Sequence, residues 1–313
     1  MANLLYHAFA FLALFSYGIY HLISATRACH ASSSTSRVAV ATADHAARPY
    51  YPLALPAHRH HLLHHLPLYL ALLSLLATIA AHVLLSTGEA RPPALRLAFL
   101  ESAAALLFFA LLSVSIFLLP LPSDVLFLLA ALSFALLSAS SAHSAAAYQQ
   151  SELQSKCDAT SSLVSAASGA AAFVLAISPR LFIAELALAS SIALQGLWSL
   201  QSGVSLYVDA FIPEGCHRLL GLRNNSPTSC DLEDSRLRAF ALLDLAFTIH
   251  SIFISVVAAI VYASITTVHT VGGLVRRHNG GSYEILPRSS STSALSDMDH
   301  IQMKTLSKST TQA

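Results

Sequence analysis

The sequence predicts an all-α integral membrane protein, a bundle of about seven transmembrane helices with a disordered C-terminal tail. Charged residues make up 11% of the chain and hydrophobic residues 55%, whereas about 25% of the residues in an average soluble domain are charged. Apolar runs of roughly 20 residues, the length that crosses a bilayer, alternate with polar stretches. Because lipid tails solvate apolar side chains directly, this composition suits a chain embedded in hydrocarbon.

Prolines and polar residues divide the apolar sequence into seven expected spans. The first lacks the preceding Lys or Arg that marks a secretory signal, so we expect it to be retained. The fifth is short and rich in Ala and Ser, and the sixth exceeds the thickness of a bilayer, so it should tilt or project. The expected spans are 3–25, 66–86, 94–119, 124–148, 160–177, 181–212 and 237–269.

The polar segments give the domain boundaries and an orientation. We expect one transmembrane domain over 1–269, with a polar loop at 26–65 and another at 213–236. The tail, 270–313, is polar and rich in Ser and Thr, which is typical of disorder. Loop Lys and Arg residues slightly favour an exoplasmic N-terminus and a cytosolic tail, in the plasma membrane or an endomembrane.

Two cysteines share the last of these loops. Cys216 and Cys230 would face the exoplasmic side in this orientation. Disulfides form and persist in oxidising compartments, so the two thiols could pair there.

A stripe of polar residues follows one face of the last expected span. Asp244, Thr248, Ser251 and Ser255 recur at helical spacing. One interpretation is the wall of a polar cavity or ion path, because polar groups inside a membrane usually face the interior of a bundle. The other is packing, because hydroxyls and small residues commonly join membrane helices.

Two acidic residues fall inside other spans. Glu101 lies about two turns into the third span, where it is either a proton-carrying carboxyl or a neutral group held by hydrogen bonds. Glu185 shares one face of the sixth span with Gly196 and Gly203. Small residues on that face predict close helix packing.

Histidines suggest a third kind of chemistry. His7 and His21 are fourteen residues apart on the first span, a spacing that resembles paired haem ligands in membrane cytochromes, although no other span carries a matching pair. His58, His61 and His65 could hold a zinc or copper ion weakly, or form a polar collar that titrates near neutrality. We predict no cofactor, with haem or metal kept as the alternative.

Several segments resemble the plant branch of the transmembrane protein 45 family, a family of unknown function. The most specific is LQGLWSLQSGVSLYVDAFIPEGCHRLL at 194–220, where Gln195, Gly196 and Trp198 match the family's Gln-Gly-x-Trp element. The first span is similar at His7 and His21. The resemblance implies seven spans and a membrane address, with no assigned catalytic residue. Many members carry an HSxDHxG-like element, whereas in this chain three alanines follow HS at 143–144.

These observations favour a non-enzymatic membrane protein that acts by assembly or in trafficking. The chain has no nucleophile elbow, phosphate-binding glycine loop or HExxH sequence, and YEIL at 283–286 fits a tyrosine-based sorting signal. One alternative is a proton-coupled transporter or channel using Glu101 and Asp244. Another is a redox protein that depends on histidine-bound metal or haem. The expected partners are the lipid bilayer and further membrane proteins, a second copy of this chain included, and no nucleic acid.

Overall fold

The structure, a computed structural model, describes residues 2–35, 46–53, 64–87, 93–147, 151–218 and 228–279. Seven helices in these ranges are long and apolar enough to cross a membrane. The protein is therefore an all-α integral membrane protein, as predicted. The helices are α1 (Ala2–Thr35), α3 (Leu66–Ser86), α4 (Pro93–Leu118), α5 (Ser123–Ala147), α6 (Glu152–Ile177), α7 (Phe182–Tyr207) and α8 (Glu233–Asn279).

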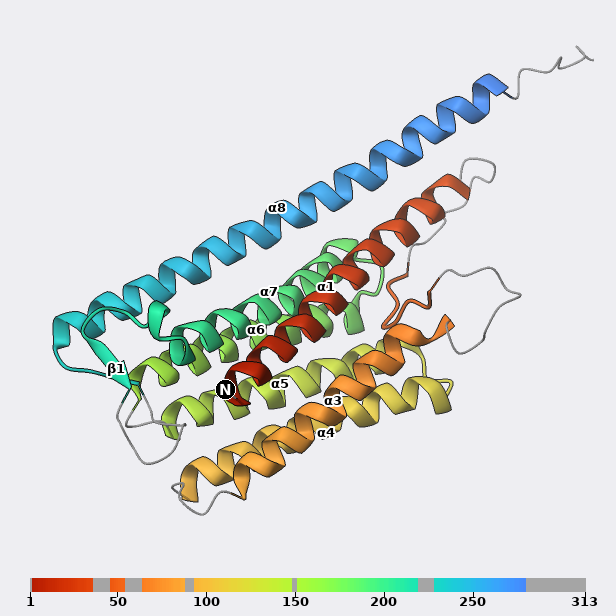
Figure 1. The fold of residues 1–313 in the computed structure, drawn as a ribbon. Helices are drawn as coiled ribbons and strands as arrows, with labels where there is room; N and C mark the ends of the chain where they lie inside the picture. Colours follow the sequence, from red (N-terminus) through yellow and green to blue (C-terminus); the bar gives the residue numbers. More distant parts are fainter. Residues whose placement is uncertain are drawn as a thin grey trace, which may run out of the picture. The chain divides into compact units, whose positions relative to one another are not determined.

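The chain divides into two compact units, Met1–Thr267 and Val268–Ala313. In the first unit, α1 packs on α7 and, less extensively, on α3 (Figure 1). The helices α3 to α7 pack on one another in chain order. Of the second unit, residues 268–279 are described, and they form the end of α8.

Close contact between α1 and α7 depends on glycines. A Cβ added at Gly18 would lie 2.6 Å from the backbone nitrogen of Ala193, and one added at Gly196 would lie 2.7 Å from that of Phe15. A Cβ on Gly203 would lie 2.5 Å from the Cβ of His7. Any larger side chain at these positions would push the two backbones apart. Glycine lets the helices approach closely without a hydrophobic driving force between them.

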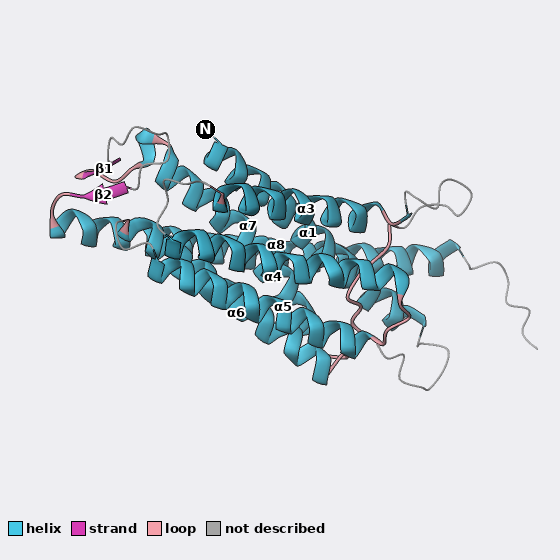
Figure 2. Cartoon of the chain, turned by 90° about the horizontal axis from the view of Figure 1, so that it is seen from below, coloured by secondary structure: helices cyan, strands magenta, loops and turns pink. Residues whose placement is uncertain are grey.

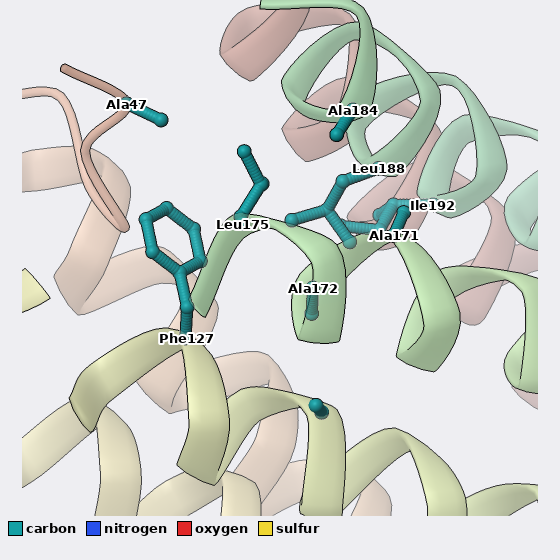
Figure 3. Close-up of a cluster of buried hydrophobic side chains, with 9 residues drawn as sticks. Ala47, Phe127, Ala171, Ala172, Leu175, Ala184, Leu188 and Ile192 are labelled. Atoms are coloured by element: carbon teal, nitrogen blue, oxygen red, sulfur yellow. The ribbon is translucent and has the colours of Figure 1, made fainter. Parts of the chain in front are cut away.

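One apolar core lies where α5, α6 and α7 meet. Figure 3 shows Phe127 of α5 facing Leu175 of α6, with Leu188 of α7 on the other side of Leu175. Ala47, from the connection after α1, completes this cluster and is 1% exposed.

A second cluster forms around Trp198, which is fully buried and meets Leu153 of α6 and Leu243 of α8. The Trp198 Nε1–H donates to the carbonyl oxygen of Cys157 over 3.0 Å.

A short antiparallel hairpin covers the end of the bundle at which α1 begins (Figure 2). It follows the 3₁₀ turn η1 (Asp209–Phe211) and pairs β1 (Cys216–Arg218) with β2 (Thr228–Cys230). A disulfide joins Cys216 to Cys230 across the two strands. The hydroxyl of Ser151, at the start of α6, donates to the carbonyl oxygen of Thr228 over 3.1 Å, which ties the hairpin to the bundle.

Several predicted helix bounds are wrong. The fifth span was expected at 160–177, but α6 begins at Glu152 because Ser151 caps it by accepting a hydrogen bond from the Gln154 amide. Residues 151–158 are therefore the first turns of a membrane helix instead of a polar connection. The sixth span was expected to run to Ile212, but α7 ends at Tyr207, where the backbone becomes extended at Val208. At 26 residues it has the length of its neighbours.

The outer helices and the first loop also differ from expectation. The first helix continues to Thr35 and the last runs from Glu233 to Asn279, so both exceed the expected spans 3–25 and 237–269. Part of the expected polar loop 26–65 packs into the protein, since Ala47 and Tyr51 are buried. Backbone hydrogen bonds hold this segment, including one from the Ala47 amide to the carbonyl oxygen of Pro179.

Candidate functional site

A cavity of about 1190 Å³ lies inside the first unit, between α1 and the helices α3 to α7. Ligand pockets in proteins usually measure roughly 300–1,000 Å³, so this space is large enough for a small molecule. The walls from α3 and α4 are mainly apolar, and Leu106, Phe109 and Leu112 are typical of them. The walls from α1, α6 and α7 carry most of the polar groups.

The α6 wall is a polar stripe that faces the cavity along its length. Its members recur every three or four residues, which places them on one helical face. The stripe consists of Gln154, Asp158, Ser161, Ser165 and Ser168. Sequence analysis missed it because residues 151–158 were assigned to a loop. The alternating spacing of four and three was the signal that could have revealed it.

Aromatic rings line the end of the cavity that lies toward the hairpin. The His7 ring is 5.7 Å from Tyr207 of α7 and 5.3 Å from Tyr6, measured between ring centroids. Tyr6 in turn lies 5.5 Å from His82 of α3, which lies 5.9 Å from Phe99 of α4. Five rings from four helices therefore form one continuous row, which we call the aromatic end.

Hydrogen bonds fix the polar atoms of this row. The Tyr6 hydroxyl is 2.9 Å from Nε2 of His82, and the His7 Nδ1 is 3.3 Å from the Ser199 hydroxyl. His7 was predicted as an intramembrane polar residue, and the structure places it on the cavity wall.

Asp158 also lines this part of the cavity. Its Oδ2 accepts a hydrogen bond from the Ser144 hydroxyl over 2.8 Å, and its Oδ1 accepts one from Nε2 of Gln154 over 3.0 Å. Asp158 and Tyr6 are close enough to interact electrostatically. In the described part of the chain, no Lys or Arg forms an ion pair with Asp158.

At the opposite end of the cavity, His21 lines the wall and lies next to Glu185, which does not itself line the cavity. Glu185 is fully buried, and its Oε1 accepts a 2.6 Å hydrogen bond from the Tyr51 hydroxyl. The same oxygen lies 3.9 Å from Nε2 of His21. The Tyr20 hydroxyl donates to the carbonyl oxygen of Tyr51 over 2.7 Å and so holds residues 46–53 in place.

Burial, and after it the Glu185 carboxylate, raise the pKa of Tyr51 above its ordinary value. The phenol therefore stays protonated and remains a donor to Glu185. His21 and Glu185, both predicted as intramembrane polar residues, thus belong to one cluster. His7 and His21 lie at opposite ends of the cavity, about 21 Å apart along the helix axis at 1.5 Å per residue.

Four atoms on residues that line the cavity have no hydrogen-bond partner among the described residues. Ser165 Oγ and His21 Nε2 belong to residues that are 1% and 4% exposed. Gln195 donates from Nε2 to the Ser161 hydroxyl, and its Oε1 has no described partner. His82 Nδ1 also has no described hydrogen-bond partner. An unmet buried polar atom costs about 1–3 kcal/mol, so these atoms are candidates for contact with a bound molecule.

Glu101 and Asp244 lie outside the cavity. Glu101 is 2.8 Å from Nδ1 of His143 on α5, and both side chains are substantially exposed, at 41% and 66%. Asp244 pairs with Lys156, whose Nζ is 2.8 Å from Oδ1. The two carboxyls are on different helices and contact different partners. The structure does not bring them together.

The rest of the α8 stripe is satisfied within its own helix. Thr248, Ser251 and Ser255 each donate to the carbonyl oxygen four residues earlier, over 2.8–2.9 Å. Thr248 and Ser255 are exposed. Of the two interpretations of this stripe, the cavity wall does not apply to the cavity described above, since none of these residues lines it.

The remaining predicted residues fall into two groups. Gly196, Gly203 and Trp198 pack helices together, and Gln195 lines the cavity. Of the suggested metal ligands, His58 and His61 lie outside the described residues, while His65 packs against Phe117. Within the described ranges, no three His, Cys, Asp or Glu side chains are placed to hold a metal ion.

The fold and this cavity define a multi-pass α-helical membrane protein with a cavity that is polar on one side. Residues 123–263 match a family described as a family of unknown function, DUF716. The match covers less than half of the chain, from the start of α5 into α8, and it agrees with a protein of the transmembrane protein 45 type. It includes Asp158, Glu185 and Gln195. No curated protein and no solved structure matches the chain.

Proposed function

We propose that this protein is a non-enzymatic membrane protein that binds a small amphipathic molecule inside its helix bundle. The cavity carries the proposal, because its polar walls from α1, α6 and α7 face mainly apolar walls from α3 and α4. A molecule with a polar group and an apolar body would match both kinds of wall. Ser165 Oγ and Gln195 Oε1, which have no hydrogen-bond partner among the described residues, offer hydrogen bonds to the polar part.

The positions of Glu101 and Asp244 favour ligand binding over the alternative of a proton-coupled transporter or channel. Glu101 and Asp244 lie outside the cavity and are paired with His143 and Lys156. A carrier that uses both carboxyls would need them on one path. The non-enzymatic part of the proposal rests on the sequence, which contains none of the common catalytic motifs.

A pair of matched variants tests the proposal. Ser165→Leu places a larger side chain in the cavity, whereas Ala167→Leu places the same side chain on an exposed face of α6. With 1-octanol as the probe and the protein in nanodiscs, saturation-transfer difference NMR measures binding above that of empty nanodiscs. We expect Ser165→Leu to weaken octanol binding about tenfold, the equivalent of 1.4 kcal/mol, and Ala167→Leu to leave it unchanged. Equal binding by the wild type and both variants would contradict the proposal.

The orientation proposed is an exoplasmic N-terminus and a cytosolic tail. The disulfide hairpin lies at the end of the bundle where α1 begins, and disulfides belong to oxidising compartments. The Lys and Arg bias of the loops points the same way. Antibody staining of cells should detect an N-terminal tag without permeabilisation, and a C-terminal tag only after it. The reverse pattern would refute this orientation.

Membrane assembly is a second candidate role, since the hydroxyl face of α8 is exposed. Thr248 and Ser255 bond within their own helix, so another membrane helix could pack on this face without leaving polar groups unmet. In a Cys29→Ser background, oxidation should cross-link Ser255→Cys into a dimer more readily than Val256→Cys, which lies on a neighbouring exposed face. Equal cross-linking at both positions would exclude a specific contact.

A trafficking role depends on the segment 283–286, which lies outside the described residues. Deleting residues 280–313 should change the membrane in which the protein accumulates, as seen by fluorescence microscopy. An unchanged distribution would count against the sorting signal.

A further inference from the structure

We propose that the aromatic end of the cavity is a subsite for an organic cation, so that the bound molecule carries a protonated amine. The inference deepens the proposed function and rests on it. Asp158, the row of aromatic rings and the unpartnered Gln195 oxygen carry it.

Among the described residues, Asp158 has no counter-charge. Two cations described at this end of the bundle pair with other carboxylates, Lys156 with Asp244 and Arg236 with Glu152, at 2.8 and 2.7 Å. Asp158 has no ion pair with a described residue. A carboxylate removed from water is costly unless it meets a cation or takes up a proton. A ligand ammonium supplies the missing positive charge.

Asp158 keeps the capacity to accept further hydrogen bonds. Ser144 and Gln154 each donate to one of its two oxygens, whereas an ionised carboxylate offers about four lone-pair sites. These two donors also fix the orientation of the carboxylate. An ammonium with three N–H donors could therefore bond to it without displacing either neighbour.

Aromatic rings line the same end of the cavity. The faces of Tyr, Trp and Phe attract cations within about 6 Å of the ring centroid. Tyr6, Tyr207 and Phe99 line the cavity and are linked through His7 and His82 into the continuous row. A carboxylate combined with aromatic faces favours a compact organic cation over an anion or a neutral polar group.

A further acceptor lies one helical turn deeper. Ser161 follows Asp158 by three residues on the same wall and receives the Nε2 donor of Gln195. The Oε1 atom of Gln195 is buried and has no described partner. It can take a second hydrogen of the ammonium, or a hydroxyl beside it. Beyond it the apolar side chains of α4 would hold the hydrocarbon part of the molecule.

Three probes with the same eight-carbon chain test this subsite. Octylamine, 1-octanol and octanoate are each titrated into nanodiscs holding the wild type, Asp158→Asn or the matched control Glu101→Gln, whose carboxyl lies outside the cavity and pairs with His143 instead of Lys156. The wild type should bind octylamine about tenfold more tightly than octanol, since a charged hydrogen bond contributes about 1.5–3 kcal/mol. Octanoate should bind most weakly. Asp158→Asn should bind the amine and the alcohol equally, whereas Glu101→Gln should keep the preference of the wild type for the amine.

The outcomes separate the subsite from the cavity itself. Octanol binding without a preference for the amine, or an amine preference that survives in Asp158→Asn, would overturn the cation subsite and leave the proposed function intact. If Ser165→Leu reduces the binding of none of the three probes, both the cation subsite and the proposed function are overturned. Should Asp158→Asn fail to fold in a thermal unfolding control, Tyr207→Leu removes one ring and should lower the amine preference alone.

Discussion

Gly203 of α7 lies directly against His7 of α1, so closely that a Cβ on the glycine would be 2.5 Å from the Cβ of the histidine. This contact connects helix packing to the cavity, because His7 belongs to the aromatic end. The His7 side chain occupies the space that a side chain at Gly203 would take.

Gly203→Ala should destabilise the protein by about 1–3 kcal/mol, the usual cost of overpacking a well-packed site. The added methyl must displace His7 or separate α1 from α7. Gly169→Ala is the matched control, since its Cβ would lie 3.3 Å from the nearest atom, the Cβ of Phe134. Unfolding in a titration with a denaturing detergent measures both variants. Equal stability of the two would show that the α1–α7 contact is not as tight as described.

Trp198→Phe should cost about 2–4 kcal/mol, because it leaves a small cavity and removes a hydrogen bond to a buried carbonyl. The indole lies fully buried, donates to Cys157 and packs edge-on against Phe247 at 5.5 Å. Phe173→Leu, on an exposed face of α6, serves as the control and should change stability little. A Trp198→Phe protein as stable as the wild type would remove this residue from the core.

Tyr51→Phe should lower stability by about 1–3 kcal/mol, since buried Glu185 then loses a donor. Because the pKa of Tyr51 is raised, the phenol remains a donor at and above neutral pH, and the loss should not vary between pH 6 and 9. Tyr69→Phe, at an exposed position of α3, is the control. A loss that disappears toward pH 9 would mean that the Tyr51 phenol ionises in that range.

Replacing Cys216 and Cys230 with serine should loosen the hairpin. The disulfide closes a loop with a sequence separation of 14, and bridging a loop of that size contributes about 3 kcal/mol in the chain-entropy model. Hydrogen exchange of the amides in 228–230 should accelerate in the double variant, while Cys29→Ser leaves it unchanged. Exchange rates that stay the same would show that Ser151 and the other contacts hold the hairpin without the disulfide.

The sequence was sufficient for the fold class, because hydrocarbon imposes a length and a composition on every span. It was less informative about the helix ends. Ser151 extends α6 by capping it, and the capping pattern was overlooked within a segment that looked polar. The burial of Tyr51 depends on Glu185, 134 residues away, and no local pattern announces such a contact.

The candidate site shows the same division. Glu185, His7 and His21 were found because a polar residue in an apolar span stands out. Asp158 was missed, while Glu101 and Asp244 attracted attention although they lie outside the cavity. Helical periodicity shows which residues share a face, but the direction of that face is decided by the neighbouring helices.

The close packing of the α1 and α7 backbones restricts the motions of the helix bundle. With Gly18, Gly196 and Gly203 leaving no slack between them, these two helices must rotate and translate as one body. If the cavity widens to admit the proposed ligand, the movement is therefore expected in α3 and α4, because α1 contacts α3 much less extensively than it contacts α7.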